Sequence, residues 1–330
     1  MDKAESTNKS SIWHFSPKLP IKGAPYFDRP NKPFKSLLYL LRSWNPLGQR
    51  CLFLILALIV WTWFTPPLER AQAFTFDWIL EVWLRNLVLL LIIAGSLHLY
   101  LIKHKKQGDD YRYDKTPMLK AKVFTFGNQV YDNMFWTLGP ALFFWTFWES
   151  LMYWSYANGY IAMISFDSSP EWFVVLILLI PLYAGFFFYW QHRLLHTPFL
   201  YKKVHTLHHR NGNTGPWSGL AMHPVESFIL MSDVLIFFLI SSHPIHMIFL
   251  IFHHGIGAPT SHTGFEHVTI GKRGKLSLGD FFHQLHHKFF DCNYGTWETP
   301  WDQWFKTFHN GTDKGTQLIA KRRMTLKGQK

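Results

Sequence analysis

Histidines are concentrated in one part of this 330-residue sequence. Fifteen of the nineteen lie within residues 192–287, and eight of these form three short boxes: HRLLH at 192–196, HTLHH at 205–209 and HQLHH at 283–287. Residues three and four apart share one face of an α-helix, with Cβ atoms about 5–6 Å apart. Each box is therefore predicted to point its imidazoles in one direction.

The eight box histidines are too many ligands for a single ion. Zinc in proteins is almost always four-coordinate, so eight convergent imidazoles predict two metal ions. Imidazole suits zinc, copper, iron and nickel alike, and ligand type alone leaves the metal open. The predicted ligands are His192, His196, His205, His208, His209, His283, His286 and His287.

The composition indicates a polytopic membrane protein. Hydrophobic residues make up 48% of the chain, with 31 Phe and 16 Trp, and they come in long blocks. The net charge of +12 comes from basic residues beside apolar segments, which is typical of cytosolic membrane flanks. No nucleic-acid-binding motif is present, and Cys51 and Cys292 alone predict no disulfide framework.

Four apolar segments are predicted to cross the bilayer, which takes about 20 residues each: 51–64, 78–101, 134–156 and 172–190. In the second, Glu81 and Arg85 are four residues apart and are expected to neutralise one another. The third carries Glu149 and is expected to be broken at Gly139-Pro140. Counted from a cytosolic N-terminus, four crossings return the chain to the cytosol just before the first histidine box.

The other segments complete the predicted architecture. Residues 1–50 are expected to form a basic cytosolic arm, most simply a solvated tail, and 313–330 a basic C-terminal tail. The apolar stretches 228–240 and 245–256 are each too short to span the bilayer, so residues 226–256 predict a re-entrant or shallow hairpin. The expected fold is all-α, with transmembrane helices in 51–190 and a cytosolic histidine-rich helical cap in 191–312.

Further motifs accompany the boxes: HPVE at 223–226, SHTGFEH at 261–267 and CNYGTWETPWDQWFKTFHNGT at 292–312. Together with the order of the boxes and the membrane context, they resemble the fatty acid hydroxylase/sterol desaturase superfamily of integral-membrane di-iron enzymes. The resemblance covers roughly residues 192–312. It is specific for the superfamily and not for the substrate.

The resemblance implies two non-haem iron ions, held by the eight box histidines and by His262. His223 and His267 are interpreted as either further ligands or supporting donors, and Tyr294 as a residue bonded to a ligand. Carboxylates that could orient the ligand rings are Glu226, Glu266, Asp280, Asp291 and Asp302. His253 and His254 are expected to pack or to line the pocket rim, and no role is expected for His14, His98, His104 and His309.

The implied activity is the oxidation of a lipid, sterol-like or fatty acyl, with O2 as co-substrate. Hydroxylation is ranked slightly ahead of desaturation. Zinc has no redox chemistry, so cleavage of an unactivated C–H bond favours iron. The sequence contains no HPGG haem motif, no flavin or nicotinamide fingerprint and no CxxC. A b-type cytochrome or a ferredoxin with its reductase is therefore the expected electron donor.

The expected location is a membrane with the catalytic face in the cytosol, the endoplasmic reticulum in a eukaryote or the inner membrane in a bacterium. The alternative function is a membrane zinc hydrolase that uses the boxes without redox chemistry. That alternative lacks a glutamate base within a box, such as HExxH would provide.

Overall fold

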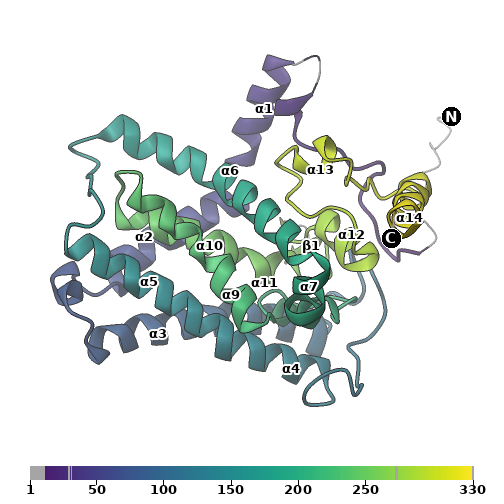
Figure 1. Ribbon diagram of the computed structural model, residues 1–330, viewed down its shortest axis with the longest axis horizontal. Coiled ribbons are helices and arrows are strands. Elements are labelled where there is room, and N and C mark those ends of the chain that lie inside the picture. The colour runs from purple at the N-terminus through teal and green to yellow at the C-terminus, as the bar shows by residue number, and fades with distance from the viewer. Residues whose placement is uncertain (1–11, 29, 31, 272–273, 329–330) are drawn as a thin grey trace.

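The computed structural model describes residues 12–28, 30, 32–271 and 274–328, and these are mainly helical. Figure 1 shows several helices packed side by side as a bundle, with α12 and α14 at one end of it. The bundle helices are α2 (Gln49–Phe64), α3 (Phe76–Leu90), α5 (Leu142–Ala157), α6 (Pro170–Leu195) and α10 (Pro244–Gly255). The others are α1 (Pro33–Ser43), α4 (Gln129–Trp136), α7 (Pro198–Leu200), α8 (Thr206–His209), α9 (Pro224–Leu230), α11 (Gly257–Ser261), α12 (Phe281–Phe289), α13 (Trp301–Trp304) and α14 (Asp313–Gly328).

Two of the described helices are long and apolar enough to cross a membrane. One is α3 with its π-helical continuation, Phe76–Lys103, and the other is α6. Only 22% of the most apolar stretch of the first and 39% of that of the second are buried. Their apolar side chains thus face outward, as contact with lipid requires. The third apolar helix, α2, has 16 residues.

The predicted break at Gly139-Pro140 is wrong. Helices α4 and α5 are joined by a π-helical turn, Thr137–Ala141, and the chain is helical throughout 129–157. Proline has no N–H to donate and crowds the preceding turn. A π turn within a helix is a common way to accommodate such a residue.

The buried ion pair of the helix bundle also differs from the expectation. Arg85 Nη2 lies 2.5 Å from Glu149 Oε1 on α5, whereas Glu81 pairs with Arg70 at 2.9 Å. Glu149 is fully buried, and a buried carboxylate is costly unless a cation neutralises it. The long Arg85 side chain therefore turns inward to Glu149 rather than along α3 to Glu81.

The apolar stretches after residue 224 form a hairpin. Helix α9 and a 3-10 helix (Met231–Phe238) run one way, and α10 returns. At its tip, the Ser242 N–H donates to the Ala162 carbonyl at 3.0 Å, and the Ser242 and Tyr156 hydroxyls lie 2.6 Å apart. Eleven of the twelve α10 residues are buried. Helix α10 is thus the central core helix, and it packs against α2, α5 and α6.

A small β-hairpin departs from the predicted all-helical fold. Strand β1 (His267–Ile270) pairs antiparallel with β2 (Gly274–Ser277). Val268, Thr269 and Ile270 favour a strand because their side chains are β-branched. Gly271, which follows β1, has a positive φ of 57°. The residue types of this segment thus favour a strand, and the prediction of an all-helical fold is wrong here.

The N-terminal arm is packed in part, through the residues before helix α1. Trp13 is buried, and its ring lies 5.2 Å from that of Phe281 on α12. The Ile21 N–H donates to the Asn310 carbonyl at 3.0 Å, so the arm is also tied to the C-terminal region. Helix α1 projects from the body in Figure 1 and has no buried residue. The predicted C-terminal tail is largely the helix α14.

Candidate metal centre

Nine histidines converge in two groups, each with its ligand atoms within 4.8 Å of one another. All but His196 are buried. The first group is His192, His196, His205, His209 and His286. The second group is His208, His262, His283 and His287. The structure thus brings together the eight box histidines and His262, the nine residues predicted from the sequence as ligands.

The prediction that each box points its imidazoles in one direction is wrong for two of the three boxes, whose histidines are divided between the two groups. His205 and His209 belong to the first group, and His208 to the second. In the last box, His286 belongs to the first group and its neighbour His287 to the second. Adjacent residues on an α-helix are rotated by about 100°. The paired histidines of an HxxHH box therefore face two different ions more easily than one.

Four structural elements position these side chains. Helix α6 carries His192 and ends beside His196, and His262 follows the end of α11. A π-helical turn (Tyr201–His205) leads into α8 and carries the second box, and α12 carries the third. Asp280 caps α12 by accepting a hydrogen bond from the His283 N–H at 3.1 Å, and burial raises the pKa of this carboxyl to about 7. Asp280 therefore holds the helix rather than a ligand ring.

Backbone carbonyls fix the orientation of four of the rings. A carbonyl only accepts, so each of these Nδ1 atoms carries the proton and each Nε2 keeps its lone pair. The four hydrogen bonds run from His192 to Tyr294 O (2.7 Å), from His286 to Cys292 O (2.6 Å), from His287 to Asn211 O (3.1 Å) and from His262 to Ala258 O (2.9 Å).

The Nε2 atoms then face one another at close range. In the second group, His262 Nε2 lies 3.0 Å from His287 Nε2. In the first, His192 Nε2 lies 3.0 Å from His205 Nε2, and His209 Nε2 lies 3.0 Å from His286 Nε2. In the pairs His262–His287 and His192–His205, both Nδ1 atoms face an oxygen acceptor, so the two Nε2 lone pairs face each other and repel unless a cation lies between them. Two ligands about 2.1 Å from one ion and at right angles stand about 3 Å apart, so the donor set fits a metal ion in each group.

The imidazoles are in the protonation state that binds metal. Burial lowers the pKa of His205 and His286 to about 3 and that of His208 to about 4. At neutral pH these rings are therefore neutral, and neutral imidazole is the metal ligand.

Glu226 lies directly behind one of these rings. Its Oε1 is 2.7 Å from His205 Nδ1, on the side of the ring opposite the converging Nε2. Burial raises the pKa of Glu226 to about 8, so a nearby positive charge is needed to keep it ionised at neutral pH. This placement suits the predicted role of Glu226 in orienting a ligand.

His223 and His267, interpreted from the sequence as further ligands or supporting donors, lie outside both groups. His223 Nδ1 accepts from the Val225 N–H at 3.2 Å and so caps α9. His267 Nδ1 lies 3.1 Å from the Ser277 hydroxyl, across the β-hairpin. The interpretation of either residue as a further ligand is not supported, because neither belongs to the two groups.

Other predicted residues also have partners of their own. Glu266 accepts from the Tyr113 hydroxyl at 2.6 Å, and Asp291 pairs with Arg323 at 2.5 Å. His254 Nε2 lies 2.8 Å from Asp233 Oδ2, and His253 Nδ1 donates to the Phe249 carbonyl at 2.8 Å. The packing role expected for these last two histidines agrees with these contacts.

The loop after α12 orients two ligand rings through its backbone carbonyls, a role that its residue types do not indicate. Asp302 accepts from the Tyr294 and Gly295 N–H groups at 2.9 and 2.8 Å. The backbone takes positive φ at Phe290 (64°) and Asn293 (52°), a conformation that non-glycine residues rarely adopt. The loop thereby presents the Cys292 and Tyr294 carbonyls to His286 and His192. Tyr294 is bonded to a ligand as predicted, but through its carbonyl.

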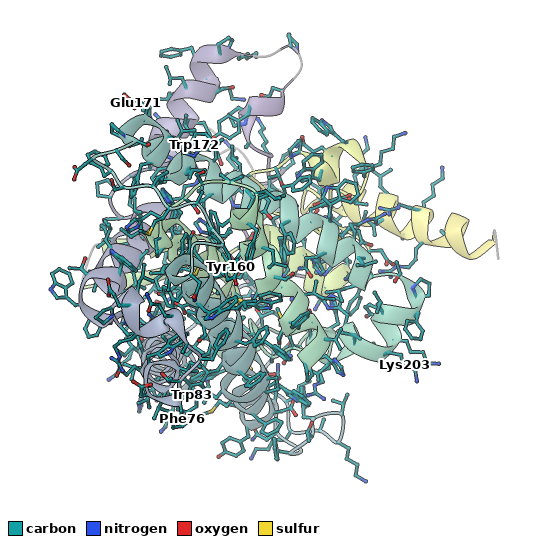
Figure 2. All side chains as sticks on the ribbon, turned by 60° about the vertical axis from the view of Figure 1, so that its left-hand side comes forward. Phe76, Trp83, Tyr160, Glu171, Trp172 and Lys203 are labelled. Carbon is teal, nitrogen blue, oxygen red and sulfur yellow. The ribbon has the colours of Figure 1, made fainter. Side chains whose placement is uncertain are left out.

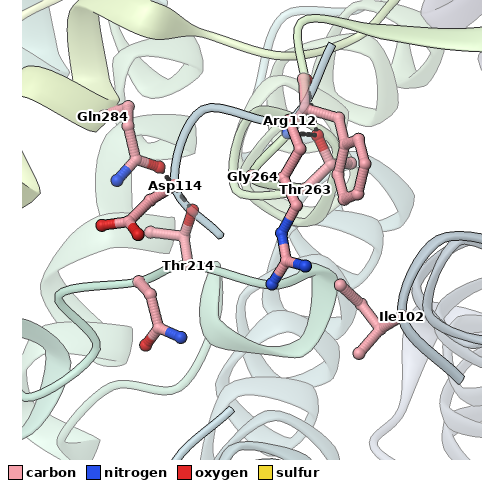
Figure 3. A pocket seen from close by; sticks show the side chains of 9 residues that line it. Ile102, Arg112, Asp114, Thr214, Thr263, Gly264 and Gln284 are labelled. Atoms are coloured by element: carbon pink, nitrogen blue, oxygen red, sulfur yellow. Dashed lines mark hydrogen bonds between the residues drawn. The ribbon is translucent and has the colours of Figure 1, made fainter. Parts of the chain in front are cut away.

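A small polar pocket lies beside the second group. Figure 3 shows Gln284 of α12 next to Thr214, whose hydroxyl donates to Gln284 Oε1 at 2.7 Å. Arg112 and Asp114 also line the pocket, which has a volume of about 10 Å³. That is room for about one water molecule, so the pocket is too small for a lipid. The hydrogen bond from Thr214 to Gln284 stabilises the position of α12.

Comparisons with known proteins agree with this centre. A fatty acid hydroxylase family model matches residues 177–307, which include all nine histidines. A putative Delta(7)-sterol-C5(6)-desaturase of Arabidopsis thaliana is 28% identical over 68% of this chain and 79% of its own. Human lathosterol oxidase is 31% identical over 42% of this chain and 46% of its own, and a Delta(7)-sterol 5(6)-desaturase of Gibberella zeae is 30% identical over 41% and 42%. The chain thus spans less than half of the last two proteins.

No solved structure gives a significant match to the chain. The family match, the sterol desaturase relatives and the three histidine boxes lead to one assignment. They support the assignment of the histidine region, residues 177–307, to the fatty acid hydroxylase/sterol desaturase superfamily.

Proposed function

We propose that this protein is a membrane-bound oxidoreductase that holds one iron ion in each histidine group and oxidises a lipid with O2. The observation that carries the proposal is the pairing of Nε2 lone pairs about 3 Å apart in both groups. Nine neutral imidazoles in two sets suit two ions of intermediate softness. Bound iron would supply the redox chemistry of oxygen activation and C–H bond cleavage.

The protein's own residues would hold the centre and keep water from it. The carbonyls of Tyr294, Cys292, Asn211 and Ala258 fix ring tautomers before any metal binds, which lowers the cost of ordering the ligands. Phe188 packs with ring centroids 5.0 Å from His192 and 5.9 Å from His283. We place Phe188 on the wall that a substrate carbon approaches.

The substrate we propose is a sterol-like lipid that enters from the bilayer. The sterol desaturase relatives favour removal of two hydrogens over hydroxylation, which reverses the ranking made from the sequence. Desaturation consumes one O2, two electrons and two protons, and it yields a carbon–carbon double bond and two waters. The two electrons must come from a partner, for which we propose a b-type cytochrome or a ferredoxin with its reductase.

We also propose four membrane crossings, two by the long apolar helices and two by α2 and the continuous helix 129–157. With a cytosolic N-terminus, this topology places the histidine groups at the cytosolic surface, of the endoplasmic reticulum in a eukaryote or of the inner membrane in a bacterium. The end of α6 supports this placement, because the same helix contains a membrane-length apolar stretch and His192.

The test is mass spectrometry of lipids from cells with and without the gene, grown with and without oxygen. We expect one lipid species to lose two hydrogens only when gene and oxygen are both present. Gain of one oxygen atom would instead establish hydroxylation. A lipid change that persists without oxygen would contradict an oxidative function and favour hydrolysis.

Glu226→Gln tests the support behind His205. The substitution preserves size but removes the negative charge, so His205 should be a poorer ligand. We expect iron affinity or lipid oxidation to fall by about 10- to 100-fold, which is typical when a hydrogen-bond partner of a metal ligand is lost. Isotope-dilution metal analysis and product formation by the purified protein measure both.

The matched control is Glu266→Gln, since Glu266 is also largely buried but bonds Tyr113 rather than a grouped histidine. It should keep its iron. Equal losses in the two variants would show that Glu226 has no special relation to the centre.

A further inference from the structure

A second region of the molecule has the features of a ligand site. Helices α3 and α5 enclose a groove of about 640 Å³, within the range of roughly 300–1,000 Å³ that is usual for small-molecule sites. Figure 2 shows two of its residues, Phe76 and Trp83, on a different part of the molecule from Lys203, which adjoins the second histidine box. The groove is lined by Phe74, Phe76, Ile79, Leu80, Trp83, Phe143, Thr146, Phe147, Ser150 and Leu151.

The groove is distant from the candidate metal centre. Asn133, near the start of the continuous helix 129–157, donates to the side chain of Asn211. The backbone carbonyl of Asn211 in turn accepts from His287, so Asn133 marks the end of this helix that is near the metal centre. Of the groove residues on that helix, Phe143 lies ten residues beyond Asn133 and Ser150 seventeen, which corresponds to about 15 and 25 Å at 1.5 Å per residue. The groove is therefore separate from the site where the lipid is oxidised.

The lining is almost wholly apolar, with two hydroxyl groups. Thr146 Oγ1 accepts a long hydrogen bond of 3.5 Å from Asn86. Ser150 is 4% exposed, and among the described residues its hydroxyl has no hydrogen-bond partner. A buried hydroxyl without a partner is unfavourable, and Ser150 is one of the residues that line the groove. With the membrane crossings proposed above, the groove faces the bilayer.

We propose that this groove binds a membrane sterol, a neutral lipid with a rigid apolar ring system and one hydroxyl group, as a site separate from catalysis. The rings of Phe76, Trp83 and Phe147 offer flat surfaces against which a fused ring system packs. The ligand's hydroxyl bonds Ser150 and satisfies it. An acyl chain would fill the same volume but would leave Ser150 without a partner.

The experiment uses the full-length protein in phosphatidylcholine nanodiscs with a photoreactive, clickable sterol. After irradiation, peptide mass spectrometry locates the labelled residues. We expect labels on 74–83 and 143–151, displaced by excess unlabelled sterol. Ser150→Ala should weaken binding by about 5- to 10-fold, the loss typical of one hydrogen bond.

Ile79→Trp should fill the groove and abolish labelling there, whereas Val88→Trp, an exposed site on the same helix outside the groove, should leave it unchanged. Size-exclusion profiles check that each variant is folded. His208→Ala should be labelled normally, because the site does not depend on the metal centre. Equal labelling by a sterol without its hydroxyl or by a fatty acyl probe, or labelling unchanged in Ile79→Trp, would overturn the proposal.

Discussion

His208→Ala should remove about one of two iron ions per chain and reduce lipid oxidation by more than about 100-fold. His208 is one of only four imidazoles in its group, and three ligands without compensation hold iron poorly. Losing a support behind a ligand already costs about 10- to 100-fold, so losing the ligand should cost more. Mass-spectrometric metal analysis of the detergent-purified protein, together with product formation, measures both effects.

His286→Ala tests the same centre in the other group, which contains five imidazoles instead of four. Four remain, so more iron should be retained than in His208→Ala, although oxidation should still be largely lost. His223→Ala and His267→Ala are matched controls, since both histidines lie outside the groups, and they should keep both ions. Unchanged iron content in His208→Ala and His286→Ala together would refute the two-ion centre.

The candidate ligands could be predicted from the sequence because their spacing is a property of helices. Three- and four-residue intervals bring His283, His286 and His287 near one another whatever the tertiary fold. The spacing does not tell which other histidines complete each group, because that depends on where α6 and α11 place His192 and His262. The spacing therefore identified the eight box histidines, the family resemblance added His262, and tertiary packing determined their arrangement.

The supports of the site were harder to predict for a physical reason. Four rings are held by backbone carbonyls, and a carbonyl is present at every residue, so no residue type marks Cys292 or Asn211 as an anchor. Asp302 was a candidate to orient a ligand directly, yet it holds the loop that presents Tyr294. The N-terminal arm shows a similar limit, because the burial of Trp13 depends on α12, about 270 residues away in sequence.

Glu149→Ala should lower the free energy of unfolding by about 3–5 kcal/mol, the usual cost of removing one partner from a buried ion pair. Arg85 and Glu149 have side chains 6% and 0% exposed. Glu149 also accepts from Asn86 at 3.0 Å and from the Tyr153 hydroxyl at 2.8 Å. The variant removes the counter-ion of Arg85 and the nearest acceptor of both Asn86 and Tyr153 within the helix bundle.

Unfolding in mixed micelles of increasing denaturing-detergent content measures this loss. Glu81→Ala is the matched control, because it deletes the same side chain from the exposed pair with Arg70 and should cost far less. The double variant Arg85→Met/Glu149→Leu should recover most of the stability, since it removes the unpaired charge as well as its partner. If Glu149→Ala were no worse than Glu81→Ala, water would have to reach Arg85, and the bundle would be more open at this depth than its packing indicates.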